Sequence, residues 1–213
     1  MPEPEVELTC EQADDRVVIA AAGARFIFRR EADRWTHGLC FSDDGPGAEP
    51  AALLLATVET PSEHDDPSRV ISPVYQELQR HDLGGEGGGV CILLTGLLHL
   101  HHFSASIVCR VDRETNRFEV DFDVADRCRS PVTALAATYL VRLGSSELAD
   151  AGPGCVAWDL PDPSSRLELT ARLPDVLALA EAGRRASRVQ VVAAVDPGGF
   201  THRLRYRWLW RDS

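Results

Sequence analysis

The sequence predicts an all-β protein, namely a large and mainly antiparallel β-sandwich with at most one short helix. Two observations predict it. Short runs of alternating apolar and polar residues recur along the 213-residue chain, and on a β-strand this alternation gives one apolar face that must be covered. Glycine, proline and aspartate separate the runs, and connections as short as 22–23 and 196–199 favour antiparallel hairpins. We expect a single domain over 1–213.

The expected strands follow one another along the whole chain. They lie at about 16–21, 24–30, 34–41, 51–59, 70–79, 89–97, 99–111, 117–125, 132–143, 155–160, 165–172, 187–196 and 200–210. The segment 174–185 is ambiguous, because Pro174 and Gly183 fit the ends of a helix while the residues between them also alternate as in a strand. Two packed sheets are the simplest architecture for this pattern, and a closed barrel is the alternative. The glycine-rich loop 84–89 is either a flap over a site or an exposed connection.

Composition excludes several classes of function. All 22 basic residues are arginine, which rules out a phosphate-binding loop lysine, a Schiff base and pyridoxal phosphate chemistry. A net charge of −11 repels nucleic acid and anionic lipid. The sequence shows neither an apolar run long enough to span a membrane nor a secretory leader, so we expect a cytoplasmic protein without membrane or nucleic-acid partners.

The six cysteines and the histidine cluster are the residues that could hold a metal. The cysteines form no CxxC pair, and we expect reduced, structural thiols. In the segment 98–103, we expect His99 and His101 to share one strand face and His102 to point to the other. Such a pair could supply two metal ligands, with a third from His81, Glu77, His37 or His202. No acidic residue follows the pair as a ligand, so we expect no metal and no cofactor.

Glu77 is the best candidate for a catalytic carboxylate. It lies in an apolar-flanked segment beside Tyr75 and Gln76, and aromatic and amide groups suit a sugar-binding cleft. No serine-hydrolase elbow is present in the sequence. The alternative is that Glu77 lies at a solvated edge of the sheet.

Two ladders of opposite charge stand out. Acidic residues at 119, 121 and 123 occupy one strand face, and Arg203, Arg205, Arg207 and Arg211 occupy one face of another strand. We expect these ladders to pair across neighbouring strands; alternatively, Arg203, Arg205 and Arg207 bind an anionic ligand. Trp208 and Trp210 then face the core. Exposed aromatic rings are expected instead from Trp35, Trp158 and Tyr75.

The segments Val17-Val18-Ile19, Ala24-Arg25-Phe26-Ile27-Phe28 and Arg34-Trp35-Thr36-His37 resemble the opening hairpins of galactose-mutarotase-like supersandwich domains. The resemblance covers about 40 residues and the strand count, and the chain is short for the family. It implies a large antiparallel sandwich that binds carbohydrate on a concave sheet. The family's enzymes use a histidine and a glutamate as acid and base, and His99, His101 and Glu77 are residues of these kinds.

Three hypotheses about function follow. The first is a carbohydrate-binding sandwich with a saccharide ligand. The second is a sugar epimerase or lyase-like enzyme that uses Glu77 with His99 or His101. The third is a non-catalytic scaffold that forms a homodimer through exposed sheet edges.

Overall fold

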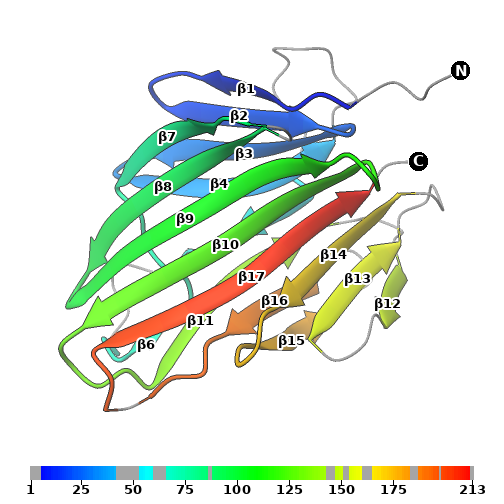
Figure 1. Cartoon of the computed structure of the whole chain (residues 1–213). Helices are drawn as coiled ribbons and strands as arrows, with labels where there is room; N and C mark the ends of the chain where they lie inside the picture. Colours follow the sequence, from blue (N-terminus) through cyan, green and yellow to red (C-terminus); the bar gives the residue numbers. More distant parts are fainter. Residues whose placement is uncertain are drawn as a thin grey trace, which may run out of the picture.

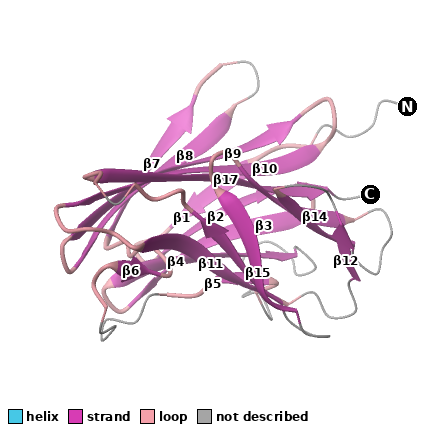
Figure 2. Ribbon diagram, turned by 90° about the horizontal axis from the view of Figure 1, so that it is seen from below, coloured by secondary structure: helices cyan, strands magenta, loops and turns pink. Residues whose placement is uncertain are grey.

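The computed structural model is a sandwich of two antiparallel sheets, as expected (Figures 1 and 2). It describes residues 6–41, 53–59, 66–85, 88–142, 147–150, 154–159, 165–182, 187–196 and 198–211, and the side chains of 147–150 and 179–182 are not described. No helix occurs among these residues. No described helix could therefore cross a membrane.

The nine-stranded sheet runs in the spatial order β1 (Thr9–Gln12), β2 (Arg16–Ala21), β3 (Ala24–Glu31), β4 (Arg34–Phe41), β5 (Leu55–Thr57), β11 (Ala134–Val141), β16 (Ser187–Val192) and β15 (Val176–Ala182), with β6 (Arg69–Val70) parallel to β11. The eight-stranded sheet runs β12 (Glu147–Asp150), β13 (Cys155–Asp159), β14 (Arg166–Ala171), β17 (Thr201–Arg211), β10 (Arg117–Cys128), β9 (His101–Asp112), β8 (Gly89–Leu98) and β7 (Glu77–Leu83). Strands β1 and β7 thus end their sheets on the same side of the sandwich (Figure 1).

Most of the expected strands form, with three differences. The segment 174–185 contains the strand β15, so the helical interpretation is wrong over its described residues. The expected strand 70–79 is divided, because β6 ends at Val70 and β7 begins at Glu77, while the chain between them is buried without joining a ladder. Strands β1 and β12 were not expected from the sequence.

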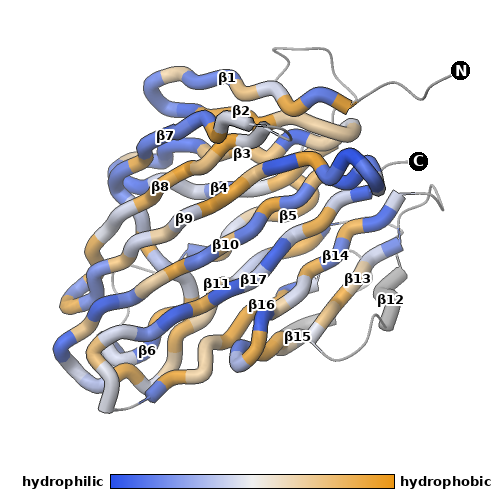
Figure 3. The backbone as a smooth tube through the Cα atoms, viewed as in Figure 1, coloured by the Kyte–Doolittle hydropathy of each residue, from blue (hydrophilic) through white to orange (hydrophobic). Residues whose placement is uncertain are grey.

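The core lies between the sheets and follows the alternation in the sequence. Along β17, the side chains of Leu204, Tyr206, Trp208 and Trp210 are almost fully buried, whereas the residues between them face outward. The tube in Figure 3 shows the same alternation of hydrophobic and hydrophilic residues along β10 and β17. Burying one face of each sheet removes a large apolar area from water, which is the main stabilising contribution to such a fold.

Candidate functional site

A cleft of about 620 Å³ opens at the side of the sandwich where β1 and β7 end the two sheets. We call it the Trp35 cleft. Its lining comes from the turn after β1, from β3 and β4, and from the start of β7. The lining residues are Gln12, Ala13, Asp14, Arg30, Trp35, Gln76, Glu77, Leu78 and Gln79. Residues more than 60 positions apart in the sequence therefore form one site.

The Glu77 side of the cleft is held by the residue before it. The Gln76 side chain accepts a hydrogen bond from the Leu97 amide at 2.7 Å and donates one to the Leu97 carbonyl at 3.0 Å. Gly96 permits this close approach, because a Cβ atom there would overlap the Val74 carbonyl. The Thr95 hydroxyl then donates to Glu77 Oε2 at 3.0 Å. These contacts fix the Glu77 carboxylate at the cleft although the side chain is exposed.

The Trp35 side of the cleft is part of the core. The Trp35 amide donates to the Tyr75 carbonyl at 2.8 Å, which ties β4 to the chain that leads into β7. Trp35 is only 7% exposed, Tyr75 4% and Trp158 2%. The expectation that these three rings are exposed is therefore wrong, because each lies on an inward-facing position. Trp35 still contributes to the cleft wall.

The polar groups of the Trp35 cleft suit a ligand rich in hydroxyl groups. The amides of Gln12 and Gln79 both donate and accept hydrogen bonds, and the carboxylates of Asp14 and Glu77 accept them. Arg30 adds guanidinium donors to the lining. A small number of polar groups that converge beside an apolar ring, here that of Trp35, is typical of a small-molecule site.

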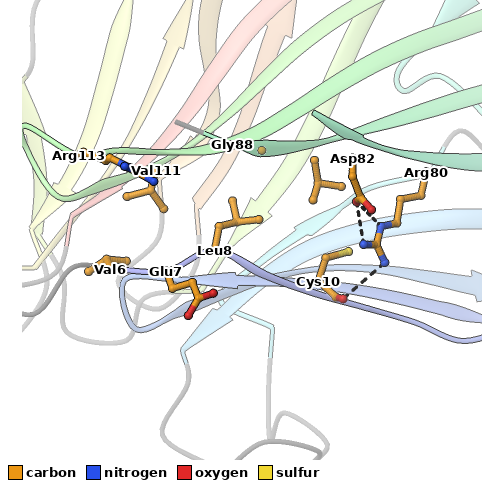
Figure 4. A pocket seen from close by; sticks show the side chains of 11 residues that line it. Val6, Glu7, Leu8, Cys10, Arg80, Asp82, Gly88, Val111 and Arg113 are labelled. Atoms are coloured by element: carbon orange, nitrogen blue, oxygen red, sulfur yellow. Dashed lines mark hydrogen bonds and ion pairs between the residues drawn. The ribbon is translucent and has the colours of Figure 1, made fainter. Parts of the chain in front are cut away.

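A second cleft, of about 500 Å³, lies farther along the same side (Figure 4). Leu8, Val90 and Val111 contribute apolar side chains to it. Arg80 crosses it, with Nη2 2.7 Å from Asp82 Oδ1 and Nη1 donating to the Cys10 carbonyl at 3.5 Å. Because the Arg80 guanidinium already has these partners, this cleft is better suited to joining the two sheet edges than to binding an anion.

The outer face of the eight-stranded sheet carries a dense group of charges. We call it the arginine face and define it by the outward residues Arg110, Arg127, Arg172, Arg203, Arg205 and Arg207 with Glu119, Asp121 and Asp123. Strand β10 pairs with β17 so that Asp121 lies opposite Arg207 and Asp123 opposite Arg205. The expected pairing of the two ladders is confirmed.

The middle of the arginine face is held by ion pairs. Arg207 Nε and Nη2 donate to the two Asp121 oxygens at 2.8 and 3.0 Å, and Nη1 donates to Glu119 at 3.1 Å. Arg110 also contacts both carboxylates, and Arg172 donates to Asp121 at 2.6 Å. Such bidentate pairs are among the strongest side-chain hydrogen bonds. Arg207 therefore has a structural role at the centre of the network.

The histidine cluster does not form the expected pair. His99 lies in the two-residue turn between β8 and β9 with a φ of 53°, and its side chain is exposed. His101 begins β9 and points into the core, where it is 1% exposed, while His102 points outward as expected. The shared face of His99 and His101 is thus wrong, because the hairpin turns between them.

Glu77 is not brought together with either histidine. It faces outward opposite Thr95, and the ladder continues from Thr95 to Ser104, whereas His101 pairs with Leu98 on the inward face. A proton relay between Glu77 and His101 would have to pass through the sheet. The acid and base pair of the enzymatic hypothesis is therefore not assembled in this structure.

His101 instead belongs to a buried group that the sequence did not reveal. Its Nδ1 lies 2.8 Å from Asp126 Oδ2, and its Nε2 lies 2.6 Å from the Pro67 carbonyl. Burial lowers the pKa of His101, but the hydrogen bonds to Asp126 and Pro67 outweigh it and raise the pKa overall. Cys128 Sγ is 4.0 Å from Nε2. This order of thiol, imidazole and carboxylate is that of a cysteine hydrolase, but Cys128 is 1% exposed, so the group is structural.

A perturbed carboxyl group, Glu59, also escaped the sequence analysis. Its pKa is raised to about 7, chiefly by burial, against the opposing attraction of Arg34. Arg34 Nη1 lies 3.6 Å from Glu59 Oε2. Nothing in the alternation of the sequence distinguishes this glutamate from the other acidic residues, because the shift depends on the burial of its side chain.

The described residues contain no group of three or more histidine, cysteine, aspartate or glutamate side chains arranged to hold a metal ion. His37 and His202, which were considered as further ligands, are both buried. His37 lies in the core with its pKa lowered to about 3 by burial. None of the six cysteines forms a disulfide.

No protein-family model matches the chain, and no curated protein matches it. Among solved structures it is similar to heparan sulfate lyase HepC from Pedobacter heparinus, with a TM-score of 0.50 and 8% identity over 98% of this chain and 35% of the lyase chain. It is also similar to a galactose mutarotase-like protein from Clostridium acetobutylicum, with a TM-score of 0.42 and 7% identity over 97% and 98% of the two chains.

The chain spans about a third of the length of the lyase that it resembles. At this level of identity the likeness concerns the fold. The likeness to the lyase agrees with the large antiparallel sandwich that the strands between residues 17 and 37 led us to expect.

Proposed function

We propose that this protein binds a carbohydrate in the Trp35 cleft. The observation that carries the proposal is the convergence of amide, carboxylate and guanidinium side chains beside one indole ring in a cleft of about 620 Å³. Sugars present many hydroxyl groups that both donate and accept hydrogen bonds, which amides and carboxylates match. The likeness to a heparan sulfate lyase is compatible with a saccharide ligand.

Calorimetric titration with a panel of neutral and acidic oligosaccharides tests the proposal. We expect saturable binding that is weakened about tenfold or more by Glu77→Gln, which replaces a charged acceptor oxygen with an amide donor, or by Gln79→Ala, which removes the side-chain amide. Glu114→Gln is the matched control, because Glu114 lies in the exposed turn between β9 and β10 and outside the cleft. Absence of binding to every saccharide in the panel would overturn the proposal.

One observation still supports the alternative that the protein is a sugar epimerase or lyase-like enzyme. Glu77 lies at a cleft large enough for a sugar and accepts a hydrogen bond that orients its carboxylate. A sugar epimerase or lyase would need a second acid or base within reach of the same ligand, and Asp14 is the other carboxylate of the cleft. Turnover that persists in both Glu77→Gln and Asp14→Asn would exclude this assignment.

A further inference from the structure

The register of the eight-stranded sheet connects the Trp35 cleft with the arginine face. One outward row runs from Glu77 on β7 through Thr95, Ser104 and Ala125 to Arg203 on β17. The neighbouring row runs from Gln79 through Leu93, Ser106 and Asp123 to Arg205. Both rows start at residues that line the cleft and end at arginines.

The side chains along the path between the two ends are short, and several of them carry hydroxyl groups. Thr95, Ser104 and Ala125 are small, so a ligand can lie close to the sheet along the first row. Glu77 and Arg203 are separated by four strand spacings, or about 19 Å at ~4.8 Å each. A ligand that contacts both must therefore be an oligosaccharide rather than a single sugar.

At the arginine end of the path, the guanidinium groups have more hydrogen-bond donors than the neighbouring carboxylates use. Six arginines face three carboxylates in the arginine face, although the whole chain has a net charge of −11. The Arg203 side chain is 61% exposed and uses one nitrogen, Nη2, to contact Asp123 at 2.9 Å. The Arg172 side chain is 51% exposed and contacts Asp121 through Nη2. Because both side chains are more than half exposed, the other N–H donors of the two guanidinium groups can reach carboxylate or sulfate groups of a ligand.

From this arrangement we infer that the carbohydrate of the proposed function is an acidic oligosaccharide. It lies across the outer sheet face, with one end in the Trp35 cleft and a carboxylate or sulfate group on Arg203 and Arg172. The inference rests on the proposed function for the cleft end. It adds the charge of the ligand, its minimum length and its direction across the strands.

The same surface is poorly suited to nucleic acid. The outward residues of the two rows include no aromatic ring on which a base could stack. The overall negative charge of the chain repels a long phosphate backbone, whereas a short ligand with few anionic groups meets mainly the local arginines.

The test compares five probes by calorimetry with the whole chain: a sulfated oligosaccharide derived from heparan sulfate, a uronic acid oligomer, the uronic acid monomer, a neutral glucan oligomer of the same length, and a single-stranded DNA oligomer. We expect an acidic oligosaccharide to bind most tightly and to weaken with added salt. Arg203→Gln and Arg172→Gln should each reduce its affinity about tenfold or more, since each removes a charge-assisted hydrogen bond. Arg188→Gln is the control of equal charge, because Arg188 is exposed on β16 of the other sheet.

The outcomes distinguish a failure of the inference alone from a failure of the proposed function. Equal affinity for neutral and acidic oligomers, sensitive to Glu77→Gln but not to Arg203→Gln, would overturn the inference and leave the carbohydrate site intact. If the acidic sugar monomer bound as tightly as the oligomer, the inferred minimum length of the ligand would be wrong. DNA that binds as tightly as the acidic saccharides would reduce the surface to a non-selective anion patch. No binding of any saccharide would overturn both proposals.

Discussion

The hydroxyl oxygens of Tyr139 and Tyr206 lie 2.6 Å apart in the core, although the two residues belong to different sheets. Tyr139 also contacts His37 Nε2 at 3.0 Å, so three side chains form one buried polar chain between β4, β11 and β17. The pKa of His37 is lowered to about 3 by burial, so the ring is neutral at physiological pH. These hydrogen bonds fix how one sheet sits on the other, because apolar contacts alone are not directional.

Tyr139→Phe is expected to destabilise the fold by about 1–3 kcal/mol, since it leaves both the Tyr206 hydroxyl and His37 without their partner. Tyr206→Phe should cost less, because Tyr139 keeps its contact with His37. Urea unfolding measures both changes. Tyr75→Phe is the control, since no hydrogen bond of its hydroxyl group occurs among the described residues; an equal loss in this variant would refute the explanation.

Arg207 and Arg203 allow a direct comparison of two ion pairs on one strand. Arg207 binds two carboxylates at the centre of the network, whereas Arg203 and Asp123 are both largely exposed. We expect Arg207→Gln to cost about 2 kcal/mol because Asp121 and Glu119 lose a shared partner. Arg203→Gln should cost less than ~0.5 kcal/mol. Similar midpoints of urea unfolding for both variants would contradict this account.

Glu59 should make stability depend on pH near neutrality. Its folded-state pKa of about 7 lies above the ordinary value of 4.5, so the folded protein holds the proton more tightly than the unfolded chain. Stability then falls as pH rises from about 4.5 to 7, by up to about 3 kcal/mol. Glu59→Gln should flatten this slope in unfolding free energies measured between pH 4 and 8. An unchanged slope would exclude Glu59 as its source.

The raised pKa of His101 should also make stability fall as pH rises, but here the cause is hydrogen bonding rather than burial. The raised pKa of His101 means that its contribution is complete below the unfolded value near 6.5 and is lost as pH rises through the folded value. Asp126→Asn should lower the pKa of His101 and destabilise the fold by about 3 kcal/mol. NMR titration of the imidazole signals measures the pKa, with His102→Asn to assign the exposed neighbour. A His101 signal that titrates identically with and without Asp126 would disprove the pairing.

The sequence by itself determined which face of each strand is buried. The alternation along 118–124 and 200–210 predicted the opposite charge ladders, their pairing and the inward position of Trp208 and Trp210. This information is local, since the period of two in a strand assigns each residue to a face without reference to the rest of the chain. The fold class follows from the same pattern.

Only the tertiary structure decided where the strands turn and what their ends meet. His99 left the strand because the hairpin between β8 and β9 turns at residues 99 and 100, so its pairing with His101 was lost. The Trp35 cleft joins Gln12 with Gln79, and the outward row joins Glu77 with Arg203, through sheet order and register. Both depend on long-range hydrogen bonds between strands, which the alternation of side chains does not specify.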